Sequence, residues 1–150
     1  MARSQLSIRF VGDVDPVLKQ HVSAFARWLR QWYWLETPLV IKFVHVDCFL
    51  GDHGDNGVLR WSRTQEAGEP VIGELAVATI SRMVDRDEVS AAYDMVLTDI
   101  GRILKYYFQT MREAPIRNDY AETWANKLLE AYIHGAMPPA PYQGAPLEDA

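Results

Sequence analysis

The sequence has one cysteine, no long apolar run and a deficit of positive charge. Cys48 is the only thiol among 150 residues, which excludes an internal disulfide and a cysteine-rich zinc site. No apolar stretch approaches the roughly 18 residues of a transmembrane helix, and residues 1–5 do not lead into a signal-peptide core. The 15 basic residues are outnumbered by 20 acidic ones, which disfavours non-specific nucleic-acid binding. We therefore expect a cytoplasmic protein that binds no nucleic acid, with membrane binding disfavoured.

The composition is that of a folded domain followed by a proline-rich tail. Hydrophobic residues make up 49% of the chain and charged residues 23%, as in soluble globular proteins. From Gly135 onward, prolines recur among small residues, at Pro138, Pro139, Pro141 and Pro146. We predict one domain over 1–135 and a disordered tail over 136–150. The PxxP spacing at 138–141 is also compatible with docking in an aromatic groove, but the composition favours a solvated tail.

Hydrophobic periodicity predicts the element order β-α-β-β-β-α-α. Alternation predicts a strand over 6–10, and Asp15 followed by Pro16 starts a helix over 16–33. The remaining predicted elements are strands over 39–46, 58–61 and 71–80 and helices over 86–112 and 119–133. This order favours an α+β fold with a small mixed sheet of about four strands, one N-terminal helix and two C-terminal helices.

The predicted helix over 86–112 has one apolar stripe and one polar stripe. The apolar stripe, which we expect in the core, comprises Val89, Tyr93, Val96, Ile100, Ile103 and Tyr107. The opposite stripe comprises Ala91, Asp94, Thr98, Gly101, Arg102, Lys105 and Gln109. In the simplest interpretation this polar stripe faces solvent, and its charged residues form ordinary surface pairs.

A second interpretation comes from a resemblance. Residues 96–107, VLTDIGRILKYY, resemble the active-site helix of small zincin metallopeptidases, which carries apolar residues, His-Glu, Gly and His in this order. Residues 118–125, NDYAETWA, are similar to the glutamate-containing helix that follows it in the family. The resemblance covers residues 39–133 and implies a minimal zincin-like fold.

The zinc-binding residues of that family are replaced in this chain. In an HExxH helix, two histidines one turn apart bind zinc and the glutamate is the general base. Thr98 and Arg102 stand at the histidine positions and Asp99 at the glutamate position. A guanidinium stays protonated and has no lone pair for a metal. The third-ligand position on the following helix is open by one or two residues: one alignment places it at Asn118, and Asp119 and Glu122 lie nearby.

The resemblance therefore implies a degenerate, catalytically inactive zincin-like domain that serves as a binding or structural module, with no metal or other cofactor. Its partner would be an unidentified protein, and its oligomeric state is open. In this interpretation Asp119 or Glu122 neutralises Arg102. The alternative enzyme hypothesis is a hydrolase with a non-standard site around Asp99 and Glu122.

The first predicted helix suggests a third possibility, a peripheral interaction module. Residues 16–34 contain Lys19, Arg27 and Arg30, no acidic residue and several aromatic side chains. A basic, tryptophan-rich amphipathic helix can bind a partner or a membrane surface. Its apolar stripe, however, suits packing on a sheet, and we expect the following residues in the core: Leu18, Val22, Phe25, Leu29 and Trp32. Trp28 and Trp34 lie off this stripe and are the candidate interface residues.

The segment from His45 to Asp55 concentrates histidine, aspartate and Cys48 in eleven residues. In a strand, His45 and Asp47 share one face while Cys48 points to the other, so these groups do not converge on a metal. Residues 51–57 have strong turn chemistry. We expect a polar hairpin turn and a core histidine here, and no metal site.

Overall fold

The computed structural model describes residues 5–35, 37–46, 49–50, 56–57, 59–62, 71–78, 89–111 and 118–141. The chain divides into two compact units, Met1–Val96 and Leu97–Ala150. The boundary lies within helix α3 (Val89–Met111), whose first residues belong to the first unit. None of the described helices combines the length and apolar character needed to cross a bilayer.

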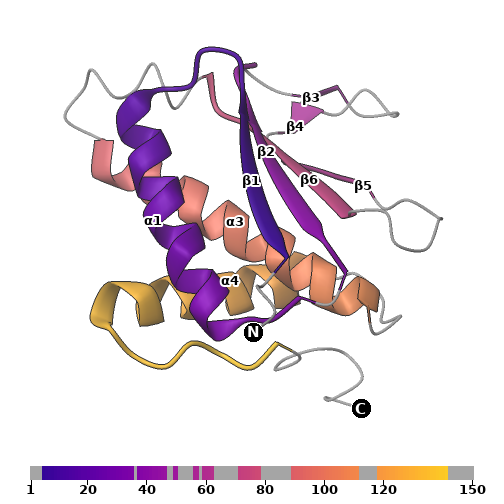
Figure 1. Cartoon of the computed structure of the whole chain (residues 1–150), viewed down its shortest axis with the longest axis vertical. Helices are drawn as coiled ribbons and strands as arrows, with labels where there is room; N and C mark the ends of the chain where they lie inside the picture. The colour runs from indigo at the N-terminus through magenta and orange to yellow at the C-terminus, as the bar shows by residue number, and fades with distance from the viewer. Residues whose placement is uncertain are drawn as a thin grey trace. The chain divides into compact units, whose positions relative to one another are not determined.

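The first unit is built on a mixed sheet with the strand order β1-β2-β6-β5 (Figure 1). Three strands are parallel: β1 (Leu6–Val11), β2 (Leu39–Val44) and β6 (Val71–Ala76). The edge strand β5 (Leu59–Ser62) runs antiparallel to β6. A separate antiparallel pair is formed by β3 (Phe49–Leu50) and β4 (Asn56–Gly57). Because β2 lies between two parallel neighbours, its residues Leu39, Val40, Ile41 and Phe43 are all buried.

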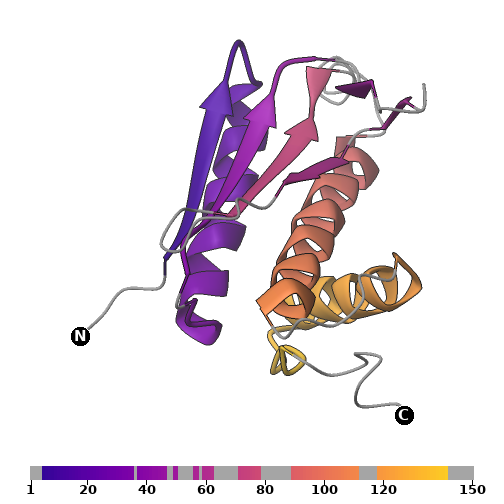
Figure 2. The same ribbon diagram turned by 90° about the vertical axis from the view of Figure 1, so that its right-hand side faces the viewer.

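Helix α1 (Pro16–Trp32) connects β1 to β2 and lies against one face of the sheet (Figure 2). The Asp15 carboxylate accepts a hydrogen bond from the backbone N–H of Leu18 at 2.9 Å, and Pro16 occupies the first helical turn. The face toward the sheet is apolar and buried; it comprises Leu18, Val22, Phe25, Ala26 and Leu29. The predicted start of this helix and four of its five predicted core residues are confirmed.

The second unit contains the rest of α3 and helix α4 (Asn118–His134). The two helices come very close at Gly101, where an added Cβ would lie 3.0 Å from Cβ and 3.2 Å from Cα of Ala125. Around this contact, Ile103, Leu104 and Leu128 are fully buried. A side chain at position 101 would hold the helices apart, so the glycine permits the close packing.

Helix α4 ends in a glycine cap that reverses the chain. Gly135 has φ +67°, and the backbone N–H of Ala136 donates to the carbonyl oxygen of Ala131 at 2.9 Å. This is the hydrogen bond of a Schellman motif, in which a residue with positive φ follows the helix. The next segment, residues 136–141, here named the strap, runs back along α4 (Figure 1).

The predicted α+β class is confirmed, and the elements of the described residues include one N-terminal helix and two C-terminal helices, as predicted. Two strands end earlier than predicted, β2 at Val44 and β6 at Ala76. The strap is the beginning of the segment predicted as a disordered tail, and two side chains donate hydrogen bonds to it. Residues 142–150 lie outside the described residues, and the single domain over 1–135 stays a prediction.

Candidate functional site

The residues at the zincin-like positions of α3 form an ion pair within one helix. The Arg102 Nη1 atom lies 3.2 Å from Oδ1 of Asp99, one turn earlier. The Arg102 Nη2 atom donates to the hydroxyl of Tyr106 at 3.4 Å. Thr98 is half-buried beside this pair. The carboxylate that the sequence resemblance aligns with the zincin general base is thus paired with the guanidinium that it aligns with a zinc ligand.

For both Asp99 and Arg102, burial and ion pairing shift the pKa in opposite directions. Burial raises the pKa of the Asp99 carboxyl, and the nearby Arg102 charge offsets this only in part. Burial would lower the pKa of Arg102, but the hydrogen bonds to Tyr106 and Asp99 outweigh it and raise that pKa. Arg102 therefore stays protonated. Burial makes the ionised form of Asp99 less favourable than it is in water.

The candidate residues at the start of α4 do not form the predicted contact with Arg102 in the described part of the structure. Asn118 and Asp119 form the start of α4, and their side chains lie outside the described part of the structure. Glu122 is exposed, and Arg102 pairs with Asp99 of its own helix instead. In the described part of the structure the partner of Arg102 is Asp99, which the i,i+3 spacing places on the same helix face, and not Glu122. Neutralisation by Asp119 stays a prediction. Among the described residues, no group of three or more His, Cys, Asp or Glu side chains could hold a metal ion.

The polar stripe of α3 is exposed at Asp94, as predicted for a solvated face, but its C-terminal part is buried. Lys105 and Gln109 are both 0% exposed, and Gly101 faces Ala125 of α4. The Lys105 Nζ atom donates to the carbonyl oxygen of Pro141 at 2.9 Å and lies 5.5 Å from the ring centre of Trp124. Neither amide atom of Gln109 has a hydrogen-bond partner in the described part of the chain. The expectation failed because a wheel of one helix does not reveal what covers its polar face.

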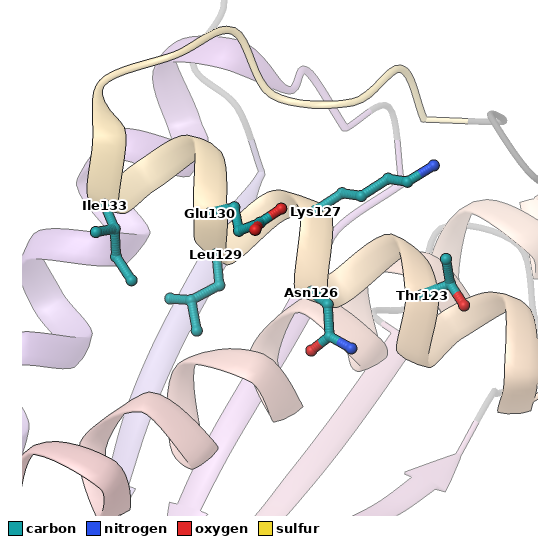
Figure 3. A pocket seen from close by; sticks show the side chains of 6 residues that line it. All are labelled: Thr123, Asn126, Lys127, Leu129, Glu130 and Ile133. Atoms are coloured by element: carbon teal, nitrogen blue, oxygen red, sulfur yellow. The ribbon is translucent and has the colours of Figure 1, made fainter.

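A shallow pocket on α4 offers little chemistry. Figure 3 shows its lining side chains, all from this one helix: Thr123, Asn126, Lys127, Leu129, Glu130 and Ile133. Asn126, Leu129 and Ile133 project from the same side of the helix (Figure 3). Ile133 is 57% exposed, and most of the other side chains are also exposed. We interpret this pocket as the open surface of α4.

The C-terminal end of α1 presents an aromatic surface, here defined as Trp28, Trp32 and Trp34. The Trp28 ring stacks on Phe25 with 5.8 Å between centroids and lies 6.5 Å from the Trp32 ring. Trp32 is 47% exposed and Trp34 is 58% exposed. The prediction of Trp32 as a core residue is therefore wrong; it is the last residue of α1 and lies at the edge of the buried stripe. Trp34 is exposed as the interface hypothesis requires, whereas Trp28 is half-buried.

The segment from His45 to Asp55 forms no functional site within the described residues. His45 is exposed, and its backbone N–H donates to the carbonyl oxygen of Val11 at 3.0 Å. The predicted core histidine is wrong because β2 ends at Val44, one residue before it. The antiparallel pairing of β3 with β4 agrees with the predicted hairpin. Asp47, Cys48, Asp52, His53 and Asp55 lie outside the described residues.

Comparisons of the chain with protein-family models, with curated proteins and with solved structures find no match.

Proposed function

We propose that this chain is a non-catalytic binding module related to the zincins, and that the aromatic surface of α1 contacts a protein partner. The α3 part of the proposal is supported by the Asp99–Arg102 ion pair at 3.2 Å. A general base must be free to accept a proton from water, and a zinc ligand must have a lone pair to donate. Asp99 is engaged by Arg102, the Arg102 guanidinium has no lone pair for a metal, and the neutral hydroxyl of Thr98 is a poor zinc ligand.

The observation that carries the binding role is the exposure of Trp32 and Trp34 at one end of α1, at 47% and 58%. Tryptophan is costly to leave in water and is enriched where proteins bind one another. The Trp32 ring is part of a packed surface, because Trp28 stacks on the buried Phe25 and Trp32 lies 6.5 Å from Trp28. Such a surface loses little side-chain entropy on binding.

The charge of α1 indicates what the partner presents. The helix carries Lys19, Arg27 and Arg30 and no acidic residue, and Arg27 is exposed one position before Trp28. Lys19 lies near the other end of the helix, over the Phe10 ring, so Arg27 and Arg30 are the cations nearer the tryptophans. A partner with an apolar pocket bordered by carboxylates would complement both the indole rings and these two cations. We therefore assign the surface to an acidic, apolar face of another protein.

Site-specific photocrosslinking tests this assignment. A benzophenone side chain placed at Trp34 should yield a discrete protein adduct in cells that express the chain, and the Arg27→Glu substitution should abolish it. The matched control is the same probe at Val17, which is 44% exposed at the other end of α1. Equal adducts at both positions would contradict the proposal, as would partition onto phosphatidylserine vesicles that depends on Trp32 and Trp34.

The zincin relationship has its own test. The triple variant Thr98→His, Asp99→Glu, Arg102→His restores the HExxH residues on the same helix. If α3 and α4 have the zincin arrangement, the folded variant should bind zinc at about one ion per chain, measured by calorimetry and elemental analysis. A folded variant that gains no zinc affinity would contradict the zincin relationship and leave the α1 surface untouched.

A further inference from the structure

We infer that the second unit contains a binding site for proline-rich peptides in extended conformation, and that the strap of the chain itself occupies this site. The inference does not depend on the aromatic surface of α1, which belongs to the other unit. It rests on how two buried side chains, Lys105 of α3 and Trp124 of α4, hold consecutive carbonyl groups of the strap.

Two donors from different helices bind neighbouring residues of the strap. The Trp124 indole Nε1–H donates to the carbonyl oxygen of Ala140 at 2.8 Å, and the Lys105 ammonium donates to that of Pro141 at 2.9 Å. Trp124 is 2% exposed and Lys105 is 0% exposed. Both donors are therefore fixed in place and withdrawn from water, which makes their hydrogen bonds selective for a backbone that presents two carbonyls at this spacing.

Aromatic packing supports the Trp124 ring of this site. The Trp124 ring meets the Phe108 ring edge to face, with 6.0 Å between centroids and an interplanar angle of 74°. Phe108 in turn meets Tyr107 at 5.5 Å. The Lys105 ammonium lies 5.5 Å from the Trp124 centroid, within cation–π range. The site thus combines an indole donor, a packed aromatic ring and a cation.

The strap has the chemistry that such a site recognises. Its sequence is Ala136-Met137-Pro138-Pro139-Ala140-Pro141. Three prolines fix φ near −65° and favour the polyproline II conformation, whose carbonyl groups have no internal partner. Pro138 is buried, while Met137 before it is 79% exposed. Docking of a preformed polyproline II segment in an aromatic-lined groove is a general mode of peptide recognition.

Gln109 is a further buried polar group of α3 in the second unit. It lies one turn after Lys105 on α3, is 0% exposed, and both its amide atoms lack a partner in the described part of the chain. A buried unsatisfied amide is unfavourable, so a group that bonds to it gains free energy.

The arrangement makes the strap a competitor in cis. A tethered segment has an effective concentration on the order of millimolar, so an added peptide must displace it. Removing the strap should therefore lower the apparent Kd for an added peptide by about tenfold or more.

The test measures binding of a fluorescent peptide with the sequence of residues 136–141 by anisotropy. The full chain is compared with a chain that ends at Gly135 and with a full chain carrying Pro138→Gly and Pro139→Gly, which loosens the strap without removing it. We expect tighter binding by both altered chains, and a shift of the Trp124 indole N–H resonance on addition of peptide. A control peptide in which alanine replaces the three prolines should bind at least several-fold more weakly.

Side-chain variants locate the binding. In the loosened chain, Trp124→Phe keeps a ring but removes the donor and should weaken binding about fivefold. Lys105→Met should also weaken it, whereas Lys127→Met, at an exposed position of α4, should not. Failure of both altered chains to bind the peptide at millimolar concentration would overturn the inference. Equal affinity for the proline and alanine peptides would overturn it as well.

Discussion

Replacing Gly101 by alanine tests whether α3 and α4 pack as closely as described. Alanine favours a helix over glycine by about 1 kcal/mol, so an unhindered site would be stabilised. Here the new methyl carbon would meet Cβ of Ala125 at 3.0 Å, Cα of Ala125 at 3.2 Å and a methyl of Leu128 at 3.2 Å. The Ala125 atoms move only with the α4 backbone, so overpacking should cost about 1–3 kcal/mol. We expect a net loss of about 1 kcal/mol, or about 2–4 °C in Tm.

Urea unfolding of a double-mutant cycle measures this contact directly. Ala125→Gly alone should cost about 1 kcal/mol, the helix penalty of glycine. In the double variant the Cβ carried by position 101 fills the space that Ala125 vacates, so the two substitutions should compensate by about 1–2 kcal/mol. A Gly101→Ala chain that is more stable than the wild type, or a cycle with no coupling, would refute the close approach.

Four further outcomes follow from the geometry. Gly135→Ala meets no atom within 4 Å but keeps φ +67°, so it should cost about 1 kcal/mol in urea unfolding through backbone strain alone. Burial raises the pKa of Asp99, so ionisation of this carboxyl disfavours the folded state. The wild type should therefore lose stability relative to Asp99→Asn as the pH rises above 3.8, the ordinary pKa of an aspartate. A stability difference that does not change with pH would contradict the burial of Asp99. Gln109→Met removes an unsatisfied amide and should leave stability unchanged or raise it by about 1 kcal/mol, whereas a loss would reveal a partner for the amide. Trp34→Ala should change stability by less than about 0.5 kcal/mol, in contrast to about 2–5 kcal/mol for Leu29→Ala, because only Leu29 is buried.

The sequence predicts well where local chemistry decides the structure. The Asp15-Pro16 pair defines the start of α1, and alternation in residues 6–10 defines β1. Burial of Ile100 and Ile103 follows from helical periodicity. In each case the deciding residues lie within a few positions of one another, so no knowledge of distant contacts is needed.

The sequence does not predict burial where a segment distant in the chain covers one face of a helix. The helical periodicity of α3 places Lys105 on the polar face, which predicts a surface residue. In the structure Lys105 is buried by α4 and the strap. Gly101 is the one local signal, since a glycine inside a helix often marks close helix packing. The proline-rich strap shows the same limit, because its hydrogen bonds to Trp124 and Lys105 depend on groups 16 and 36 residues away.

The position of β1 at the outer side of the sheet has a consequence for aggregation. In the described sheet β1 pairs only with β2, so its other side is a free edge that a strand from another chain could extend. The Leu39 N–H bonds to the Gln5 carbonyl, so strand alternation directs the Leu6 carbonyl toward this free edge. There the Nε–H of Arg30 donates to it at 2.8 Å. Arg30 thus acts as a gatekeeper: it occupies an acceptor that an incoming strand would need and places a charge at the point of entry.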